Sequence, residues 1–347
     1  MPVPLELPAG FPTRVWVVEQ PPGALLPAGP WTLVGDQAVR PAWAAAGLPE
    51  PPGTLWLEVS EAGKRLETLL PWLETWARIP LRRDATVVAV GGGVLTDMAG
   101  LAASLYMRGI RWQAWPTTLL AQVDAGLGGK TGVDLAAGKN LAGAFHPPED
   151  LVVCRSFLRT LPPRQLAAGR WEIFKMALLA GDLDWAGTLL EDGLPAPETL
   201  LRALRAKAEI VHRDPLEQGE RRLLNLGHTL GHALEAASDY RLLHGEAVGL
   251  GTLAACCLSE AQGLPPFPPD FLARTGSRLA PLASLVPPWE ACREWLTRDK
   301  KSAADRQNPA RTAIHCIMPC PRALAEQRLL PPEAWGPAHR RMLAFLT

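Results

Sequence analysis

Five short runs of β-branched and apolar residues, separated by stretches with helical spacing, constrain the fold of the first half of this chain most strongly. The runs cover residues 13–18, 31–35, 54–59, 86–90 and 150–154. Strands that alternate with helices are typical of a parallel sheet, because each parallel connection needs a crossover segment. We therefore predict an α/β domain over residues 1–160.

The second half of the chain has a different pattern. Leucine- and alanine-rich stretches with helical spacing follow one another between proline and glycine residues, at 164–182, 184–191, 197–213, 223–237, 245–262 and 287–298. We predict an all-α domain over residues 161–347. A chain of 347 residues that is 48% hydrophobic is long enough to form two such cores.

The balance of charge excludes some classes of partner. Thirty-five basic and 35 acidic residues cancel, so no overall field favours nucleic acid or an anionic membrane. The N-terminus has no basic start before an apolar stretch, and the apolar run near residues 247–258 is too short for a bilayer. We expect a cytoplasmic protein whose six cysteines, which form no CxxC pair, are reduced and mostly buried.

A glycine turn at residues 91–93 follows a predicted strand and precedes helical spacing. Such a turn lets the main chain approach a pyrophosphate, whose charge a helix N-terminus stabilises. The dinucleotide pattern GxGxxG fails because Thr96 stands at its third glycine position, so a purely structural turn stays an alternative. The segment "GLGGKTG" at 126–132 misses the P-loop pattern at Asp124, but leaves Lys130 as a candidate phosphate contact.

Three of the seven histidines lie within residues 224–248. His228 and His232 are four residues apart and project from one face of a predicted helix, without the glutamate of the HExxH pattern. His244 follows a predicted turn that would return it to the same place. Catalytic zinc takes three protein ligands, and Glu172 lies among apolar neighbours where an unpaired carboxylate is costly. The segment therefore predicts a metal site, with helix capping or core hydrogen bonding as the alternative.

Lysine is scarce in this chain. Only seven of the 35 basic residues are lysines, at positions 64, 130, 139, 175, 207, 300 and 301. The lysine ammonium is a compact, strongly hydrated charge that a guanidinium does not replace. The scarcity is therefore either chance or a sign that these positions bind ligands.

Several segments together resemble the 3-dehydroquinate synthase family. They are "GGGVLTDMAG", "YMRG", "PTTLLAQVDAGLGGKTGVD", "GKNLAGAFHPP", "LRTLPPRQLAAG", "EIFK", "GERRLLNLGHTLGHALEA", "LHGEAV" and "RDKK", in family order over about residues 60–301. The resemblance implies a Rossmann-like domain that binds NAD, an all-α domain that binds a divalent metal (Zn or Co), and a homodimer.

The resemblance also assigns roles to residues, and all seven lysines fall among them. The metal ligands would be Glu172, His228 and His244, with His232 in catalysis or substrate contact. The NAD site would use Asp36, Glu61, Lys64, Gly92, Gly93, Val94, Asp97, Thr117, Thr118, Lys139 and Thr160. Substrate phosphate and carboxylate would be bound by Arg108, Asp124, Lys130, Asn140, Lys175, Lys207, Arg221, Asn225, Lys300 and Lys301.

The implied reaction explains these residue types. The family's substrate is 3-deoxy-D-arabino-heptulosonate 7-phosphate, a sugar acid phosphate. Metal coordination would acidify its C5 hydroxyl while NAD accepts the C5 hydride. Phosphate would then be eliminated, the hydride returned, and the ring opened and reclosed by an aldol step. Because the substrate carries several anionic groups, the reaction needs a pocket of lysines and arginines.

Three other functions remain open from the sequence. One is another sugar phosphate cyclase of the inosose or valiolone type, and a second is a metal-dependent polyol dehydrogenase, whose small neutral substrate would leave the basic pocket unexplained. A third is a homologue that binds nucleotide without turnover, against which the retained histidines argue. The chain also departs from the family pattern at Trp171, where an alanine is usual beside Glu172.

Overall fold

The structure is a computed structural model that describes residues 4–79, 81–298, 302–303 and 313–347. The chain divides into two compact units. The first contains Met1–Leu166 and Ala196–Leu216, and the second contains Ala167–Pro195 and Glu217–Thr347. The domain boundary expected after residue 160 lies near the first change of unit, and the cofactor and metal roles given to the two domains stay predictions.

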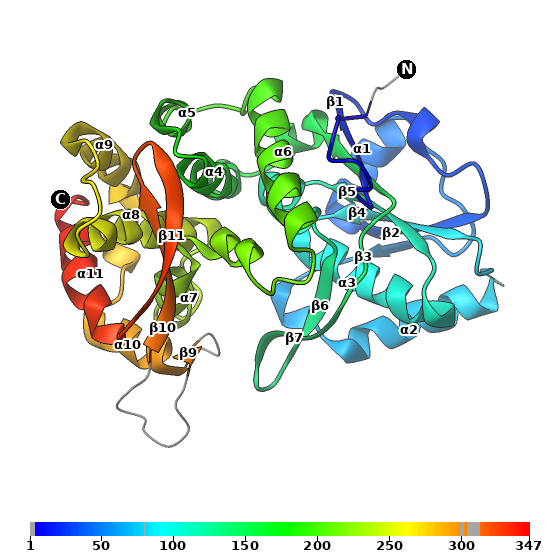
Figure 1. The fold of residues 1–347 in the computed structure, drawn as a ribbon. Helices are drawn as coiled ribbons and strands as arrows, with labels where there is room; N and C mark the ends of the chain where they lie inside the picture. The colour runs from blue at the N-terminus through cyan, green and yellow to red at the C-terminus, as the bar shows by residue number, and fades with distance from the viewer. Residues whose placement is uncertain (1–3, 80, 299–301, 304–312) are drawn as a thin grey trace. The chain divides into compact units, whose positions relative to one another are not determined.

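The first unit contains a six-stranded sheet in the order β1-β8-β5-β4-β2-β3, and every pair in it is parallel. Figure 1 labels β1, β2, β3, β4 and β5 of this sheet. Its strands are β1 (Arg14–Val18), β2 (Trp31–Asp36), β3 (Leu55–Leu57), β4 (Thr86–Gly91), β5 (Arg111–Pro116) and β8 (Asp150–Cys154). The predicted Rossmann-like sheet is thus confirmed. Within this sheet, β5 was not predicted, because buried Gln113, which donates to Asp150, interrupts its apolar pattern.

The order of the strands predicts where a ligand would bind at one end of the sheet. The chain passes from β2 outward to β3, returns to β4 on the other side of β2, and continues to β5. The carboxyl ends of the strands on either side of such a reversal form the usual binding crevice of open α/β sheets. The other elements of this unit are α1 (Arg40–Ala45), α2 (Leu66–Arg78), α3 (Gly93–Leu105), α6 (Pro197–Arg213) and the antiparallel pair β6 (Lys130–Leu135) and β7 (Gly138–Phe145).

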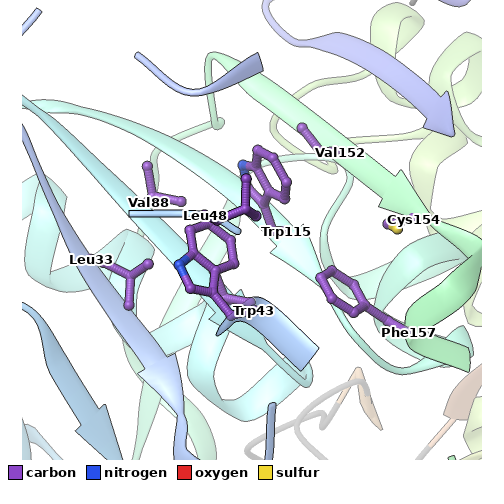
Figure 2. Close-up of a cluster of buried hydrophobic side chains, with 9 residues drawn as sticks. Leu33, Trp43, Leu48, Val88, Trp115, Val152, Cys154 and Phe157 are labelled. Atoms are coloured by element: carbon purple, nitrogen blue, oxygen red, sulfur yellow. The ribbon is translucent and has the colours of Figure 1, made fainter. Parts of the chain in front are cut away.

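Large aromatic side chains form the core beside this sheet. Trp43 from α1 packs edge-on against Trp115 from β5, with ring centroids 5.5 Å apart. Leu33 of β2 and Val88 of β4 belong to the same buried cluster, as Figure 2 shows. Since each indole buries about 150–250 Å² of surface, this cluster holds the central strands in place and fixes the positions of their carboxyl ends.

The second unit is mainly helical, as predicted. Its helices are α4 (Pro163–Leu179), α5 (Leu183–Thr188), α7 (His228–Ala237), α8 (His244–Ala261), α9 (Pro269–Leu279), α10 (Trp289–Arg298) and α11 (Trp335–Ala344). The structure adds a small antiparallel sheet, formed by β9 (Ser302–Ala303), β10 (Ala313–Cys320) and β11 (Ala323–Leu330). Helix α8 is buried over most of its length, because small residues along it let other elements pack closely.

Two further expectations concern cysteines and membranes. All six cysteines are free and buried, and burial raises the pKa of the Cys256 thiol well above its usual range. Such thiols are poor nucleophiles, which agrees with the predicted structural role. In the parts of the chain that the structure describes, we find no helix with both the length and the apolar character needed to cross a bilayer.

Candidate functional site

Glu172, His228 and His244 lie together in the second unit. Helix α4 carries Glu172, while His228 and His244 are the first residues of α7 and α8 (Figure 1). One ligand-type atom of each residue lies within 4.8 Å of those of the other two. The Nε2 atoms of His228 and His244 are 3.6 and 3.4 Å from Glu172 Oε1. Residues that are 72 positions apart in the sequence thus converge on one point, and the turn expected before His244 is present.

Glycines let the main chains of these helices come close enough for the three side chains to meet. A Cβ atom on Gly245 would lie 1.9 Å from the carbonyl oxygen of Ala168 on α4. A Cβ atom on Gly251 of α8 would lie 2.0 Å from the carbonyl oxygen of Gly227, which precedes α7. Real side chains do not tolerate such distances, so each glycine is required by the close packing. The positions of Glu172 and His244 therefore depend on contacts between main chains.

Glu172 is a buried anion surrounded by positive charge. Burial raises the pKa of its carboxyl, but Lys175 and His244 outweigh burial and lower the pKa to about 2. Neither carboxylate oxygen makes a hydrogen bond of normal geometry, although Lys175 Nζ contacts Oε2. A buried carboxylate that lacks such bonds and faces two imidazole nitrogens fits a divalent cation with one carboxylate and two histidine ligands.

His244 responds to the same negative charge. Burial lowers the pKa of its imidazole, but the contacts of its two nitrogens with the Glu172 and Glu235 carboxylates, and the negative charges of these groups, raise it to about 10. The His244 imidazole is therefore positively charged at neutral pH when no metal ion is bound, with a proton on each ring nitrogen. Because a metal-bound imidazole must be neutral, a cation that binds here would displace one of these protons.

His232 lies beside this group and outside it. Its ring centroid is 5.4 Å from that of His228 and 6.0 Å from that of His244. It forms a second set of nearby ligand-type atoms with Glu235 and His244, and that set does not include Glu172. The structure thus contains two sets of candidate ligands that share His244, and it places His228, but not His232, in the set with Glu172. A catalytic or substrate-contacting role for His232 stays a prediction.

Trp171, which departs from the family pattern, packs between α4 and α8. Its ring lies against Gly249 of α8, where a Cβ atom would be 2.6 Å from Trp171 Cδ2. It also meets Phe174 edge-on, with centroids 5.2 Å apart. Trp171 is buried, so the bulk of its side chain fills space that Gly249 leaves. This residue therefore supports the α4–α8 contact that positions Glu172.

Several predicted NAD-binding residues gather at the carboxyl ends of the central strands in the first unit. Asp36 ends β2 and accepts a hydrogen bond from the Ala38 amide at 3.0 Å. Gly92 precedes α3, and the Thr117 amide after β5 donates to the Gly91 carbonyl at 2.9 Å. Gly93, Val94 and Thr118 belong to the same two segments. These residues lie at the strand ends where the strand order predicts a binding crevice, beside a helix N-terminus of the kind that suits a pyrophosphate.

Lys64 links other candidate residues of the first unit. Its ammonium is buried and donates to Asp97 Oδ2 at 2.6 Å and to Asn140 Oδ1 at 2.7 Å. Burial raises the pKa of Asp97 to about 6, although Lys64 lowers it. Lys139 pairs with Glu61 at 3.0 Å on a more exposed surface. The structure therefore joins Asn140, expected at the substrate, directly to two residues expected at the cofactor.

The remaining predicted residues fall into the two units as follows. In the first unit, Lys207 of α6 donates to the Asp124 carbonyl at 2.5 Å and also contacts its carboxylate. Lys130 begins β6, Arg108 lies on an exposed turn with φ +66°, and Thr160 ends the 3₁₀ segment Arg155–Thr160. In the second unit, Arg221 and Asn225 lie in the 3₁₀ segment Glu220–Asn225. Lys300 and Lys301 lie outside the described residues.

Acidic residues that the sequence patterns did not predict contact several predicted site residues, and one of them, Glu217, accepts from Asn225 Nδ2 at 3.1 Å. Glu235 Oε2 lies 3.1 Å from His244 Nδ1. Asp134 Oδ1 accepts from the main-chain N–H of Asn140 at 2.7 Å. A signal for Glu235 was available, since it lies seven residues after His228 and therefore on the same face of one helix. Asp134 gave no comparable signal, because a strand pairing brings it near Asn140.

Comparison with known proteins places the chain in a family. The family model for the 3-dehydroquinate synthase N-terminal domain matches residues 54–168, and that for the C-terminal domain matches residues 169–302. The chain is 42% identical over 270 residues to 3-dehydroquinate synthase of Xanthomonas axonopodis pv. citri, covering 73% of each protein.

Solved structures share the fold. A crystal structure of 2-deoxy-scyllo-inosose synthase with carbaglucose-6-phosphate, NAD+ and Co2+ matches with a TM-score of 0.78 at 22% identity, covering 98% of this chain and 99% of that one. The 2-epi-5-epi-valiolone synthase from Streptomyces hygroscopicus subsp. jinggangensis, with NAD+ and Zn2+ bound, matches with a TM-score of 0.73 at 28% identity, covering 94% and 96%. These structures show the shared fold, and the two domain matches with the 42% identity over 270 residues show that the chain belongs to the 3-dehydroquinate synthase family.

Proposed function

We propose that this chain is an NAD- and divalent metal-dependent enzyme that converts 3-deoxy-D-arabino-heptulosonate 7-phosphate to 3-dehydroquinate and phosphate. The observation that carries the proposal is the group of Glu172, His228 and His244, buried beside the Lys175 ammonium. Sequence identity to a 3-dehydroquinate synthase supports the choice of reaction. The reaction class is a carbon–oxygen lyase, because the C–O bond to phosphate breaks without hydrolysis.

The proposed ligand set fits the metal through its donor chemistry. Two imidazole nitrogens and one carboxylate are borderline and hard donors that suit Zn or Co and leave coordination positions open. The related valiolone synthase, which holds Zn2+ and NAD+, supports this choice. When bound, the ion would acidify a substrate hydroxyl while NAD would accept and return a hydride.

The residues of the first unit would bind the cofactor through the strand ends. Asp36 would accept hydrogen bonds from a ribose, as acidic residues after the second strand do in such folds. The amides around Gly92 and Gly93 would bind the pyrophosphate. Lys64 would hold Asp97 and Asn140 in place, since its ammonium bonds both side chains.

The remaining charged residues would bind the anionic groups of the substrate. Lys130, Lys175 and Lys207 offer compact ammonium groups that exchange partners readily. Two of them now contact carboxylates, Lys175 at Glu172 and Lys207 at Asp124. His232 would hold or transfer a proton near the ligand set, since an imidazole has ring nitrogens that both donate and accept hydrogen bonds.

Two other cyclase reactions are the main competitors. The fold neighbours that catalyse inosose and valiolone formation are 22% and 28% identical to this chain, whereas the dehydroquinate synthase relative is 42% identical. The difference favours dehydroquinate as the product. A polyol dehydrogenase would bind a neutral substrate and would leave the buried lysines without a function.

Parallel measurement of phosphate and NADH tests the proposal. We expect that the heptulosonate phosphate, NAD and Zn2+ or Co2+ give one phosphate per substrate consumed and no accumulation of NADH. Mass spectrometry should identify 3-dehydroquinate as the product. Net formation of NADH would replace this proposal with a dehydrogenase, and turnover of another sugar phosphate in preference would replace it with another cyclase.

We also propose that the chain is a homodimer, as its family resemblance implies. Light scattering during size exclusion should then give about twice the chain mass of 37.5 kDa. A mass that stays at one chain over the accessible concentration range would contradict it.

A further inference from the structure

The two imidazoles of the proposed metal site are anchored through their Nδ1 atoms. His228 Nδ1 lies 3.1 Å from the main-chain carbonyl of Leu226, and His244 Nδ1 lies 3.1 Å from Glu235 Oε2. A carbonyl and a carboxylate both accept hydrogen bonds, so each Nδ1 carries a hydrogen. An imidazole that is protonated only at Nδ1 has a lone pair on Nε2, and both Nε2 atoms face Glu172.

We propose that Glu235 is a positioning residue of the metal centre, which fixes the tautomer and the ring orientation of His244. The inference rests on the proposed metal role of Glu172, His228 and His244. A carboxylate that accepts from the distal nitrogen of a ligating histidine orients the ring and strengthens its donor nitrogen. Glu235 is not a ligand in this arrangement, because it contacts the opposite side of the ring from Glu172.

Glu235 is itself held rigidly. Its side chain is buried, and its carbonyl accepts from Ser238 Oγ at 3.0 Å and from the Tyr240 amide at 2.9 Å. The Leu242 amide in turn donates to Ser238 Oγ at 3.4 Å, which ties the α7–α8 turn to the end of α7. The residue that holds the His244 ring therefore also anchors the turn that leads to His244.

The position of His244 explains why this ring needs a side-chain acceptor. His228 finds its acceptor two residues away in its own chain segment, at the Leu226 carbonyl. His244 follows a turn in which Asp239 and Tyr240 both have positive φ, so its ring depends on a bond across to α7. A helix-borne carboxylate is a rigid acceptor for this purpose.

The set of His232, Glu235 and His244 could instead bind a second ion. That arrangement would make His244 bind an ion through each of its nitrogens. A histidine that does so must lose both ring hydrogens, whereas a single ion at Nε2 leaves the Nδ1 hydrogen on Glu235. The geometry therefore favours one ion and an orienting carboxylate.

The test compares Glu235→Gln and Glu235→Ala with Ser238→Ala as the matched control. The glutamine keeps the size of the side chain and an oxygen that accepts from Nδ1, whereas alanine removes the acceptor. Ser238→Ala disturbs the same turn and leaves the Glu235 carboxylate in place. The measurements are Zn2+ affinity by chelator competition, metal stoichiometry, and the visible absorption of the Co2+-loaded full-length protein.

We expect Glu235→Ala to weaken Zn2+ binding by about 10–100-fold and to change the Co2+ absorption bands. Glu235→Gln should retain most of the affinity, and Ser238→Ala should keep both the affinity and the spectrum of the unaltered protein. If the alanine variant fails to fold, Glu235→Met replaces it, because methionine keeps the size of the side chain and lacks the oxygen that accepts from His244 Nδ1; weaker Zn2+ binding and altered Co2+ bands then support the proposal, and unchanged ones contradict it.

Two outcomes would overturn the positioning role. Zn2+ affinity and Co2+ bands that are unchanged in folded Glu235→Ala would show that Glu235 does not act on His244. Two ions per chain in the unaltered protein, and one in Glu235→Ala, would make Glu235 a ligand of a second ion. Failure of the proposed function looks different, because His244→Ala would then bind Zn2+ as well as the unaltered protein does.

Discussion

Two buried lysine–carboxylate pairs, one in each unit, have the same chemistry and opposite behaviour. Lys175 contacts Glu172 in the helical unit, and Lys64 contacts Asp97 at 2.6 Å in the α/β unit. Burial raises the pKa of both carboxyl groups. The net pKa of Glu172 nevertheless falls to about 2, whereas that of Asp97 rises to about 6.

The surrounding groups account for the difference. Glu172 has a second positive neighbour in His244, so its negative charge is stabilised twice. Asp97 has one positive neighbour, Lys64, whose ammonium also donates to Asn140. The negative charges of Asp124 and Glu61 further raise the pKa of Asp97. The comparison teaches that the number of positive neighbours, rather than burial alone, decides whether a buried carboxyl stays ionised well below neutral pH or titrates closer to it.

Of the two pairs, the one with Glu172 should give the largest effect when its carboxylate is replaced, both on stability and on metal content. Glu172→Ala removes the carboxylate that contacts the buried Lys175 ammonium, so we expect a loss of about 3–5 kcal/mol in the free energy of unfolding of the metal-free protein. Zn2+ should also be lost. Denaturant unfolding and metal analysis measure the two effects, with Glu172→Gln as the control that keeps the volume. An unchanged metal content in the alanine variant would remove Glu172 from the site.

The second test disrupts the main-chain contact between Gly245 and Ala168, which positions His244. A methyl group at Gly245 would collide with the Ala168 carbonyl, so Gly245→Ala should cost about 1–3 kcal/mol of stability and weaken Zn2+ binding. The matched control is Gly187→Ala in α5, where a methyl group would have ample room. We expect that control to stabilise by about 0.4–1 kcal/mol. Equal Zn2+ affinity in both variants would show that the α4–α8 contact does not position the ligands.

The pH dependence of the free energy of unfolding tests the raised pKa of Asp97. Its folded pKa of about 6 lies above the ordinary value of 3.8. Its stabilising contribution is therefore complete below pH 3.8 and is lost as the pH rises through 6. The stability of the unaltered NAD-free protein relative to Asp97→Asn should fall by about 2 kcal/mol between pH 4 and 7. Denaturant unfolding at several pH values measures this, and a difference that is flat with pH would refute it.

The exposed pair of Lys139 and Glu61 should give the smallest effect on stability. Its side chains are 39% and 50% exposed, so Lys139→Ala should change the free energy of unfolding by less than about 1 kcal/mol. If Lys139 binds NAD, calorimetric titration should nevertheless show weaker NAD binding. Lys64→Ala is the contrast, since the loss of a buried ammonium should reduce both stability and NAD binding. An equal stability loss in the two variants would contradict the distinction.

The candidate metal group shows which features of a site a sequence pattern predicts and which it does not. The spacing of His228 and His232 predicts two imidazoles on one helix face, but it does not say which of them binds the ion. The structure separates them because the start of α8 brings His244 to Glu172 and His228, with His232 outside that group. Glu235 was missed for a related reason, since its contact with His244 depends on how the α7–α8 turn folds back.

The strands show the same limit in the fold. All five apolar runs gave strand ends within two residues of those observed, because buried parallel strands are nearly all apolar. β5 did not stand out, since its Gln113 is buried through a hydrogen bond to a strand 37 residues away. The β10–β11 hairpin was also missed, and its exposed alternate residues weaken the apolar signal.

The sequence by itself determined the α/β and helical halves, the glycine turn after β4 and the residue types of a metal site, because these depend on local periodicity and side-chain chemistry. Only the tertiary structure decided which groups meet. Glu172 and His244 come together because glycines let three helices touch through their main chains. Lys64 reaches Asp97 and Asn140 because β7 brings a distant segment to α3. Such contacts depend on the packing of whole elements, which no short stretch of sequence encodes.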